Sequence, residues 1–455
     1  MTSEEKPLDA AIRGLARGGA LARAVELWRP GSWLELDERI RSGYTWRGMG
    51  RPTHPWLAER GRPTVLRALL GSPTPSEAEL ALALCDGDGR IRAAALPHAA
   101  GRPAVLPLVA VRTADWAAPV RDEAHAVLAG ALPGADAGTL AVTAPVILRL
   151  RARLRGGTAT ALLGEVLRAA PPATVAALLL NRDRATRRFA LDVGVERGLL
   201  TPAELAGLAA YDTDVVVRDK AASAALAAGV PDETLPVLLA ARSGTVRSAG
   251  VTALRKAGRA AEAEPSLYDR SALVRACARW VLRQDGRDPL PLYRAACTGP
   301  ATVPGRAPLG LAECGDRNAG LPVLWELTGH AHPLVRSSAV AGLRVLEAAD
   351  HDRLLALLND PAPGVVREAA RALLPWADRL PEDELVRRTG PGRPVTVRVR
   401  ALRLLRAHGS AAYEETARRL ARDPDPELRT RIRRTLGIGE AVPRPAEARS
   451  RLWRT

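Results

Sequence analysis

The chain is 455 residues long, carries a formal net charge of +16 and has an isoelectric point near 10.8. With 47% hydrophobic and 25% charged residues, its composition is typical of a folded protein and excludes a wholly disordered chain. No apolar run reaches the roughly 18 residues that a membrane-spanning helix needs, and the polar N-terminal segment is unlike a secretory signal. We therefore expect a cytoplasmic protein with no membrane partner.

The first 74 residues form a predicted N-terminal capping segment that is rich in aromatic side chains. Its stretch 42–56 contains too much glycine for a helix and carries Tyr44, Trp46, Arg47 and Arg51. One interpretation is a long ordered loop that shields the end of a stack of repeats. The other is a binding loop of aromatic and arginine side chains, since long loops are often functional.

Residues 75–436 contain a repeat of about 30 residues, whose most regular feature is an arginine that follows an apolar residue. That arginine recurs at intervals between 28 and 36 residues, at positions 92, 121, 151, 187, 218, 247, 275, 306, 336, 367, 400 and 429. A fixed period in this range is the mark of stacked-repeat proteins. Within one copy, residues 231–254 predict two short helices separated by the turn at Ser243 and Gly244.

Prolines and aspartates lie where such helical pairs need them. Pro202, Pro231 and Pro289 fall near predicted first-helix starts, where the missing N–H costs nothing. An aspartate four residues before the arginine, in a position suited to capping the second helix, occurs at Asp88, Asp183, Asp214 and Asp425.

The motif Val-Arg-x-x-Ala-x-x-Ala-Leu after a polar turn, as in Val366-Arg367-Glu368-Ala369-Ala370, resembles the HEAT-repeat superfamily, in particular its PBS-lyase HEAT-like variant. The resemblance implies an all-α fold, an α-solenoid built as a right-handed superhelix of about twelve stacked helical hairpins with second helices lining a concave groove. In that family the aspartate and the arginine hydrogen-bond across the stack as a structural ladder. Carried onto this chain, the ladder would comprise Arg121, Arg218, Arg247, Arg275, Arg336, Arg367, Asp214 and Asp425, with Asp214 paired to Arg218 and Asp425 near Arg429.

Patterns of catalytic and metal-binding residues are mostly missing from the sequence. It has no His-Glu dipeptide, which the HEAT-type hydroxylases use to hold iron, and no phosphate-binding GxxxxGK loop or GxSxG elbow. The cysteines Cys85, Cys277, Cys297 and Cys314 are scattered singly, so neither a disulfide framework nor a zinc site is expected. His330 and His332 lie in a predicted turn with too few further ligands for a metal. We therefore predict no metal, no cofactor and, with less support, no enzyme activity.

The C-terminal repeats and the basic tail 437–455 are rich in arginine, and this positive charge is the basis for the predicted binding function. The favoured interpretation is a scaffold that binds a protein or peptide with an acidic surface in the concave groove. The alternative is a nucleic-acid-binding protein related to HEAT-like DNA glycosylases, since phosphate contacts also need a row of cations. The predicted binding residues are Arg279, Arg283, Arg371, Arg403, Arg406, Arg431, Arg433 and Arg434.

Overall fold

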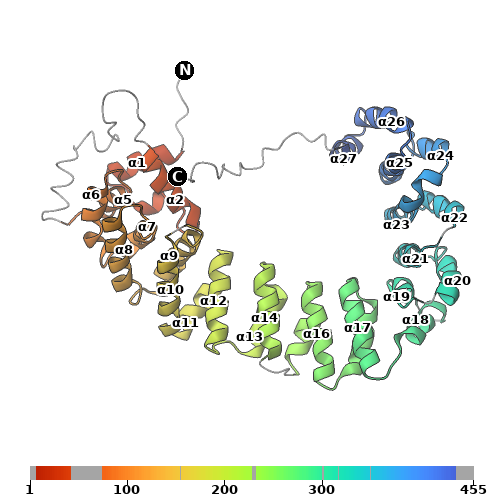
Figure 1. Ribbon diagram of the computed structural model, residues 1–455, viewed down its shortest axis with the longest axis horizontal. Helices are drawn as coiled ribbons and strands as arrows, with labels where there is room; N and C mark the ends of the chain where they lie inside the picture. The colour runs from red at the N-terminus through yellow and green to blue at the C-terminus, as the bar shows by residue number, and fades with distance from the viewer. Residues whose placement is uncertain are drawn as a thin grey trace. The chain divides into compact units, whose positions relative to one another are not determined.

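The computed structural model describes residues 7–42, 74–153, 155–227, 232–299, 302–315, 317–348 and 350–436. All regular structure in these ranges is helical, without a strand (Figure 1). The chain divides into two compact units, residues 1–242 and 243–455, and each is described by itself. None of the described helices is both long and apolar enough to cross a membrane. The predicted loop residues Tyr44, Trp46, Arg47 and Arg51 and the tail 437–455 lie outside the described residues.

The first unit is a series of helical hairpins. Its α-helices are α1 (Pro7–Ala16), α2 (Pro30–Ser42), α5 (Glu77–Leu84), α6 (Gly89–Ala95), α7 (Leu106–Arg112), α8 (Ala118–Ala131), α9 (Ala137–Leu150), α10 (Gly157–Ala169), α11 (Pro172–Leu179), α12 (Arg184–Glu196), α13 (Pro202–Tyr211), α14 (Val215–Ala227) and α15 (Thr234–Ala240). The two helices of a hairpin contact each other, and equivalent helices of successive hairpins, such as α12 and α14, lie side by side (Figure 1).

The second unit repeats the same arrangement. Its α-helices are α16 (Gly244–Lys256), α17 (Ala272–Gln284), α18 (Pro289–Thr298), α19 (Ala307–Glu313), α20 (Arg317–Leu327), α21 (Pro333–Val345), α22 (His351–Ala356), α23 (Pro363–Leu373), α24 (Glu382–Arg388), α25 (Val395–His408), α26 (Ala412–Ala421) and α27 (Pro426–Leu436). The second helices α19, α21, α23, α25 and α27 contact one another in that order. Each unit is thus a stack of hairpins, which confirms the predicted all-α solenoid.

The capping predictions from sequence are confirmed at the turns between the helices. The Asp88 carboxylate accepts from the Arg90 backbone N–H at 2.9 Å, and Asp183 accepts from Thr186 at 2.8 Å. Asp214 accepts from Val217 and Asp425 from Glu427 in the same way. In the turn before α21, Nδ1 of His332 accepts the Leu334 backbone N–H and caps the helix, and Nδ1 of His330 accepts the His332 N–H within the turn. Caps matter because helices of this length are marginal without such support.

Stacking buries a thin continuous core of small and branched side chains. Alanine and glycine on the second helices allow close approach, as at Gly310 of α19, which lies against the buried ring of Tyr293 from α18. All four cysteines are free, and Cys85 and Cys297 are buried. No group of three potential metal-ligating side chains occurs among the described residues.

Candidate functional site

The recurring arginine forms a structural ladder, but its carboxylate partner differs from the predicted one. Arg187 of α12 donates from Nε and Nη2 to both oxygens of Asp212, each at 3.0 Å, and from Nη1 to the Asn181 carbonyl of its own turn. The acceptor Asp212 lies six residues before the next arginine, Arg218, and therefore belongs to the next repeat. Equivalent carboxylate pairs join Arg92 to Asp115, Arg247 to Asp269, Arg336 to Asp360 and Arg398 to Asp423.

The predicted pairing of Asp214 with Arg218 is therefore wrong. Asp214 accepts from Nε and Nη2 of Arg188 at 2.8 and 2.7 Å, and this hydrogen bond lowers the pKa of Asp214 to about 2. Arg218 donates instead to the carbonyls of Asp212 and Thr213 in its own turn. Likewise, Asp425 caps α27 and Arg429 donates to the Asp423 carbonyl at 2.7 Å. The aspartate four positions before the arginine is a cap. The aspartate six positions before it, or seven at Asp360, is the ladder partner of the arginine in the preceding repeat.

Within the described ranges, two predicted ladder members make no carboxylate link to a following repeat. There, Arg121 donates to the Asp115 carbonyl at 3.3 Å and forms a loose ion pair with Asp122. The Nε of Arg218 is buried and has no hydrogen-bond partner among the described residues. The cause is in the sequence, because the position six residues before Arg247 is Ala241 instead of an aspartate. Ala241 has φ −57° and ψ 148°, nearly the backbone angles of Asp212 at −59° and 145°.

The N-terminal end of the ladder is a buried charge network. Asp115 accepts from Arg92 and from Nη1 of Arg112, and Arg112 also forms an ion pair with Asp37 of α2. The side chains of Arg92 and Arg112 are each only 1% exposed. Burial alone would raise the pKa of Asp115, but the hydrogen bond from Arg92 and the charge of Arg112 bring it below its ordinary value. This network ties α2 to the first repeats.

Arg367, a third predicted ladder member, lies on the surface. Arg367 lies seven positions after Asp360, whereas Arg275 and Arg429 lie six positions after Asp269 and Asp423. One extra residue rotates a helical side chain by about 100°, so Val366 takes the inward position and Arg367 is exposed. A similar shift occurs in α25, where Arg398 takes the ladder position and Arg400 does not.

Arg367 and Arg400 gather with other arginines along the second helices of the second unit, in a surface that we call the arginine groove. It consists of three adjoining hollows. The first, of about 550 Å³, lies across the starts of α19, α21 and α23; the second, of about 200 Å³, lies between α23 and α25; and the third, of about 310 Å³, lies between α25 and α27. The charged residues that line them are Arg306, Arg367, Arg371, Arg400, Arg403, Arg431 and Arg434, together with Glu368.

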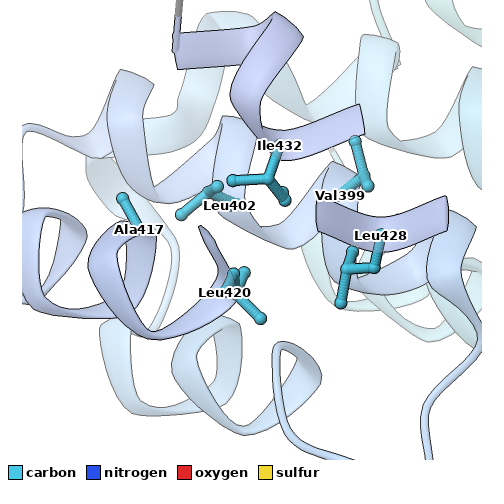
Figure 2. Packing of buried hydrophobic residues seen from close by; sticks show 6 residues of the cluster. All are labelled: Val399, Leu402, Ala417, Leu420, Leu428 and Ile432. Atoms are coloured by element: carbon cyan, nitrogen blue, oxygen red, sulfur yellow. The ribbon is translucent and has the colours of Figure 1, made fainter. Parts of the chain in front are cut away.

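A buried apolar cluster fixes the helices at the C-terminal end of this groove. Figure 2 shows Val399 and Leu402 of α25 and Leu428 and Ile432 of α27, with Ala417 and Leu420 of α26 beside them. Each of these side chains is at most 6% exposed. The cluster determines which faces of α25 and α27 point outward, and those faces carry the groove arginines.

Positive charge in the groove is poorly balanced by the protein itself. Arg371 pairs with Glu368 and Arg431 with Glu427, both within one helical turn. Within the described part of the chain, Arg306, Arg367, Arg400, Arg403 and Arg434 form no ion pair. Burial, followed by repulsion from the neighbouring arginines with Arg403 first, lowers the pKa of Arg400 below its usual value. Arginine nevertheless stays protonated in proteins, so the repulsion persists at neutral pH.

The structure brings together half of the predicted binding residues. Arg371, Arg403, Arg431 and Arg434 line the groove. Arg279 is placed differently, since it donates to Glu313 at 2.6 Å with a side chain only 12% exposed, and Glu313 also holds Arg275. Arg283 is exposed on α17, which contributes no residue to the three hollows. Arg406 and Arg433 are exposed on α25 and α27 but are not among the residues that line the hollows.

The sequence prediction missed three groove residues, namely Arg306, Arg367 and Arg400. For Arg367 a signal existed, because the spacing from the preceding aspartate is one residue longer than in the regular repeats. For Arg400 the signal was Arg398, a second arginine at the regular ladder position. Arg306 precedes α19 and is not within a helix, so helical periodicity held no information about it.

No protein-family model and no curated protein matches the chain. Among solved structures it is similar to Kap121p, with a TM-score of 0.30 and 14% identity over 94% of this chain and 53% of that one. It is also similar to Kap95p, with a TM-score of 0.34 and 12% identity over 95% and 59% of the two chains, and to an engineered protein, with a TM-score of 0.21 and 16% identity over 95% and 98%. The chain thus spans little more than half the length of Kap121p or Kap95p. At TM-scores below 0.5, these similarities carry no conclusion about function.

Proposed function

We propose that this protein is a non-catalytic interaction scaffold, and that its arginine groove binds an acidic segment of a protein or peptide. The observation that carries the proposal is that five of the seven groove arginines, Arg306, Arg367, Arg400, Arg403 and Arg434, have no ion-pair partner within the described ranges. Keeping guanidinium groups close together without anions costs free energy, and an acidic ligand removes that cost on binding. Carboxylates also match the planar fork of arginine, which favours bidentate hydrogen bonds.

The character of the lining supports a peptide ligand over a nucleic acid. Apolar side chains alternate with the arginines, among them Leu334 in the first hollow and Leu374 and Leu404 in the second. Leu334 and Leu374 are partly exposed, so they offer contact area to apolar residues of a ligand. Among the residues that the structure describes, no aromatic side chain lines the three hollows, whereas proteins that bind single strands stack bases on aromatic rings. A peptide that combines acidic and apolar residues fits both properties.

Charge reversal in the groove tests this function. We expect the double variant Arg367→Glu with Arg403→Glu to lose binding to acidic peptides by about 100-fold, because two attractive contacts become repulsive. The measurement is fluorescence anisotropy with a labelled pool of 12-residue peptides randomised over Asp, Glu, Leu and Ser. A single-stranded and a double-stranded 12-nucleotide DNA serve as parallel probes at two salt concentrations.

The matched control is Arg406→Glu with Arg433→Glu, which changes the net charge equally on exposed positions outside the hollows. Both variants should keep the helical circular dichroism of the parent protein. If both double variants weaken peptide binding equally, the peptides bind through the general positive charge of the protein and not through the groove. If DNA binds more tightly than the peptides and with a steep salt dependence, the nucleic-acid function is favoured instead.

A further inference from the structure

The third hollow of the groove concentrates more positive charge than the other two. It is lined by Val399, Arg400, Arg403, Arg431 and Arg434, has a volume of about 310 Å³, and contains no acidic side chain in its lining. Two guanidinium groups come from α25 and two from α27. Four cations around one small hollow call for a ligand group with more than one negative charge.

We propose that this hollow binds a phosphorylated side chain within the acidic protein segment that the arginine groove takes up. The proposal deepens the proposed function and rests on it. A phosphoryl group brings a charge of about −1.5 to −2 at neutral pH and three acceptor oxygens, where a carboxylate brings one charge and two oxygens. Arginine clusters recognise phosphorylated residues through such charge-assisted, bidentate hydrogen bonds.

Helix geometry explains why the four guanidiniums converge. Arg400 and Arg403 are three residues apart on α25, and Arg431 and Arg434 are three apart on α27, so each pair shares one face of its helix. The apolar cluster of Val399, Leu402, Leu428 and Ile432 locks the rotation of the two helices (Figure 2). The arginines thus reach the same hollow from two rigid elements, which lowers the cost of ordering them around a ligand.

Internal ion pairs do not compete strongly for this hollow. Within the described residues, Arg400, Arg403 and Arg434 have no ion-pair partner. Arg431 pairs with Glu427 at 2.6 Å, but the two side chains are 46% and 61% exposed. Exposed pairs within one helical turn contribute only a few tenths of a kcal/mol and exchange readily for a stronger acceptor. The lowered pKa of Arg400 is consistent with a site whose counterion comes from a ligand.

The surroundings favour a phosphorylated segment over a free phosphate ion. The second hollow shares Arg400 and Arg403 with the third and adds the apolar side chains Ala370, Leu374 and Leu404. Residues that flank a phosphorylated side chain can therefore contact this apolar surface while the phosphoryl group occupies the third hollow. Inorganic phosphate gains no such contacts, and we expect it to bind only weakly.

The test compares three labelled pools of 12-residue peptides randomised over Asp, Glu, Leu and Ser, with a fixed central serine, phosphoserine or glutamate. With the full-length parent protein, we expect the phosphoserine pool to bind about 10-fold more tightly than the serine pool, and more tightly than the glutamate pool. In Arg403→Gln with Arg434→Gln, this preference should vanish, whereas Arg406→Gln with Arg433→Gln should keep it. Inorganic phosphate and a single-stranded 12-nucleotide DNA are used as competitors.

The outcomes separate this inference from the proposed function. Equal binding of the phosphoserine and serine pools to the parent, with both weakened by the Arg367→Glu and Arg403→Glu pair, overturns the phosphoryl site and leaves the acidic-peptide groove intact. Absence of binding by all three pools overturns both. Displacement of the phosphoserine pool by DNA at equal concentration, or by inorganic phosphate at low millimolar concentration, contradicts the assignment to a phosphorylated protein segment.

Discussion

At the scale of single residues, the protein uses arginine for two opposite purposes. In the ladder, each guanidinium lies between its own turn and a carboxylate of the next repeat, as Arg92 does with Asp115. In the groove, each guanidinium faces the surface without such a partner. A shift of one or two positions along a helix decides between the two, as Arg367 and Arg400 demonstrate.

Asp115 is the residue on which the N-terminal ladder most depends. In Asp115→Asn the buried guanidiniums of Arg92 and Arg112 lose their shared countercharge, and we expect a loss of about 3 kcal/mol in the free energy of unfolding. Urea unfolding followed by circular dichroism measures it. The control is Asp122→Asn, whose carboxylate is 71% exposed and lies 3.6 Å from Arg121, and which should change stability by less than about 0.5 kcal/mol. Equal effects of the two substitutions would argue against a structural role of the ladder.

Much of the residue-scale pattern could be predicted from sequence, but the bonding partners could not. The recurring arginine and the capping aspartates Asp88 and Asp183 were identified correctly because both follow local rules. The partner of Arg275 is Glu313, which lies 38 residues away at the end of α19. Only the tertiary packing of neighbouring repeats brings those two side chains together.

At the scale of helices, close packing rests on a few small residues. A Cβ at Gly310 would lie 2.1 Å from the Tyr293 ring, which is fully buried and donates through its hydroxyl to the Leu267 carbonyl at 2.8 Å. Neither the ring nor α19 can move without breaking contacts on its far side.

We therefore expect Gly310→Ala to lower the free energy of unfolding by about 2 kcal/mol, from overpacking between α18 and α19. Gly207 of α13 is the comparison, because a Cβ there has no atom within 4 Å. In that helix Gly207→Ala should raise stability by up to about 1 kcal/mol, since alanine loses less backbone entropy. Thermal unfolding of both variants checks the contrast, and changes of the same sign would contradict it.

The order of the helices was predictable from the repeat, and so were the helix starts that a proline marks. Prolines marked α13 and α18 correctly, since Pro202 and Pro289 are their first residues. The segment 260–268 was harder to predict, because Pro265 lies inside it and the chain forms a 3-10 helix there in place of a first α-helix. Helical periodicity does not distinguish these two kinds of helix in such a short stretch.

At the scale of the whole molecule, stability is a sum of contacts between neighbouring repeats. The series of ladder links is interrupted in the first unit at Arg218, where Ala241 takes the place of a carboxylate, one residue before the division between the two units. The interruption predicts that the packing of α14 against the turn at Ala241 is a weak point within the first unit.

Restoring the missing carboxylate tests this idea. We expect Ala241→Asp to raise the midpoint of the first unit's unfolding by the equivalent of about 1 kcal/mol, because the buried Nε of Arg218 gains an acceptor. The backbone angles at Ala241 already suit an aspartate in this role. Hydrogen exchange of the full chain, followed over the helices of the first unit, measures the change, and calorimetry gives the midpoint. A lower midpoint than in the matching Ala241→Asn variant would show that the added charge stays unpaired.

The kinds of side chain that line the arginine groove also decide how pH can affect ligand binding there. The lining of the three hollows includes no histidine, and guanidinium groups keep their proton at every physiological pH. Acidification therefore leaves the charge of the groove arginines unchanged. Under the proposed function, occupancy would instead depend on phosphorylation of the ligand segment and on the ionic strength that screens its charge.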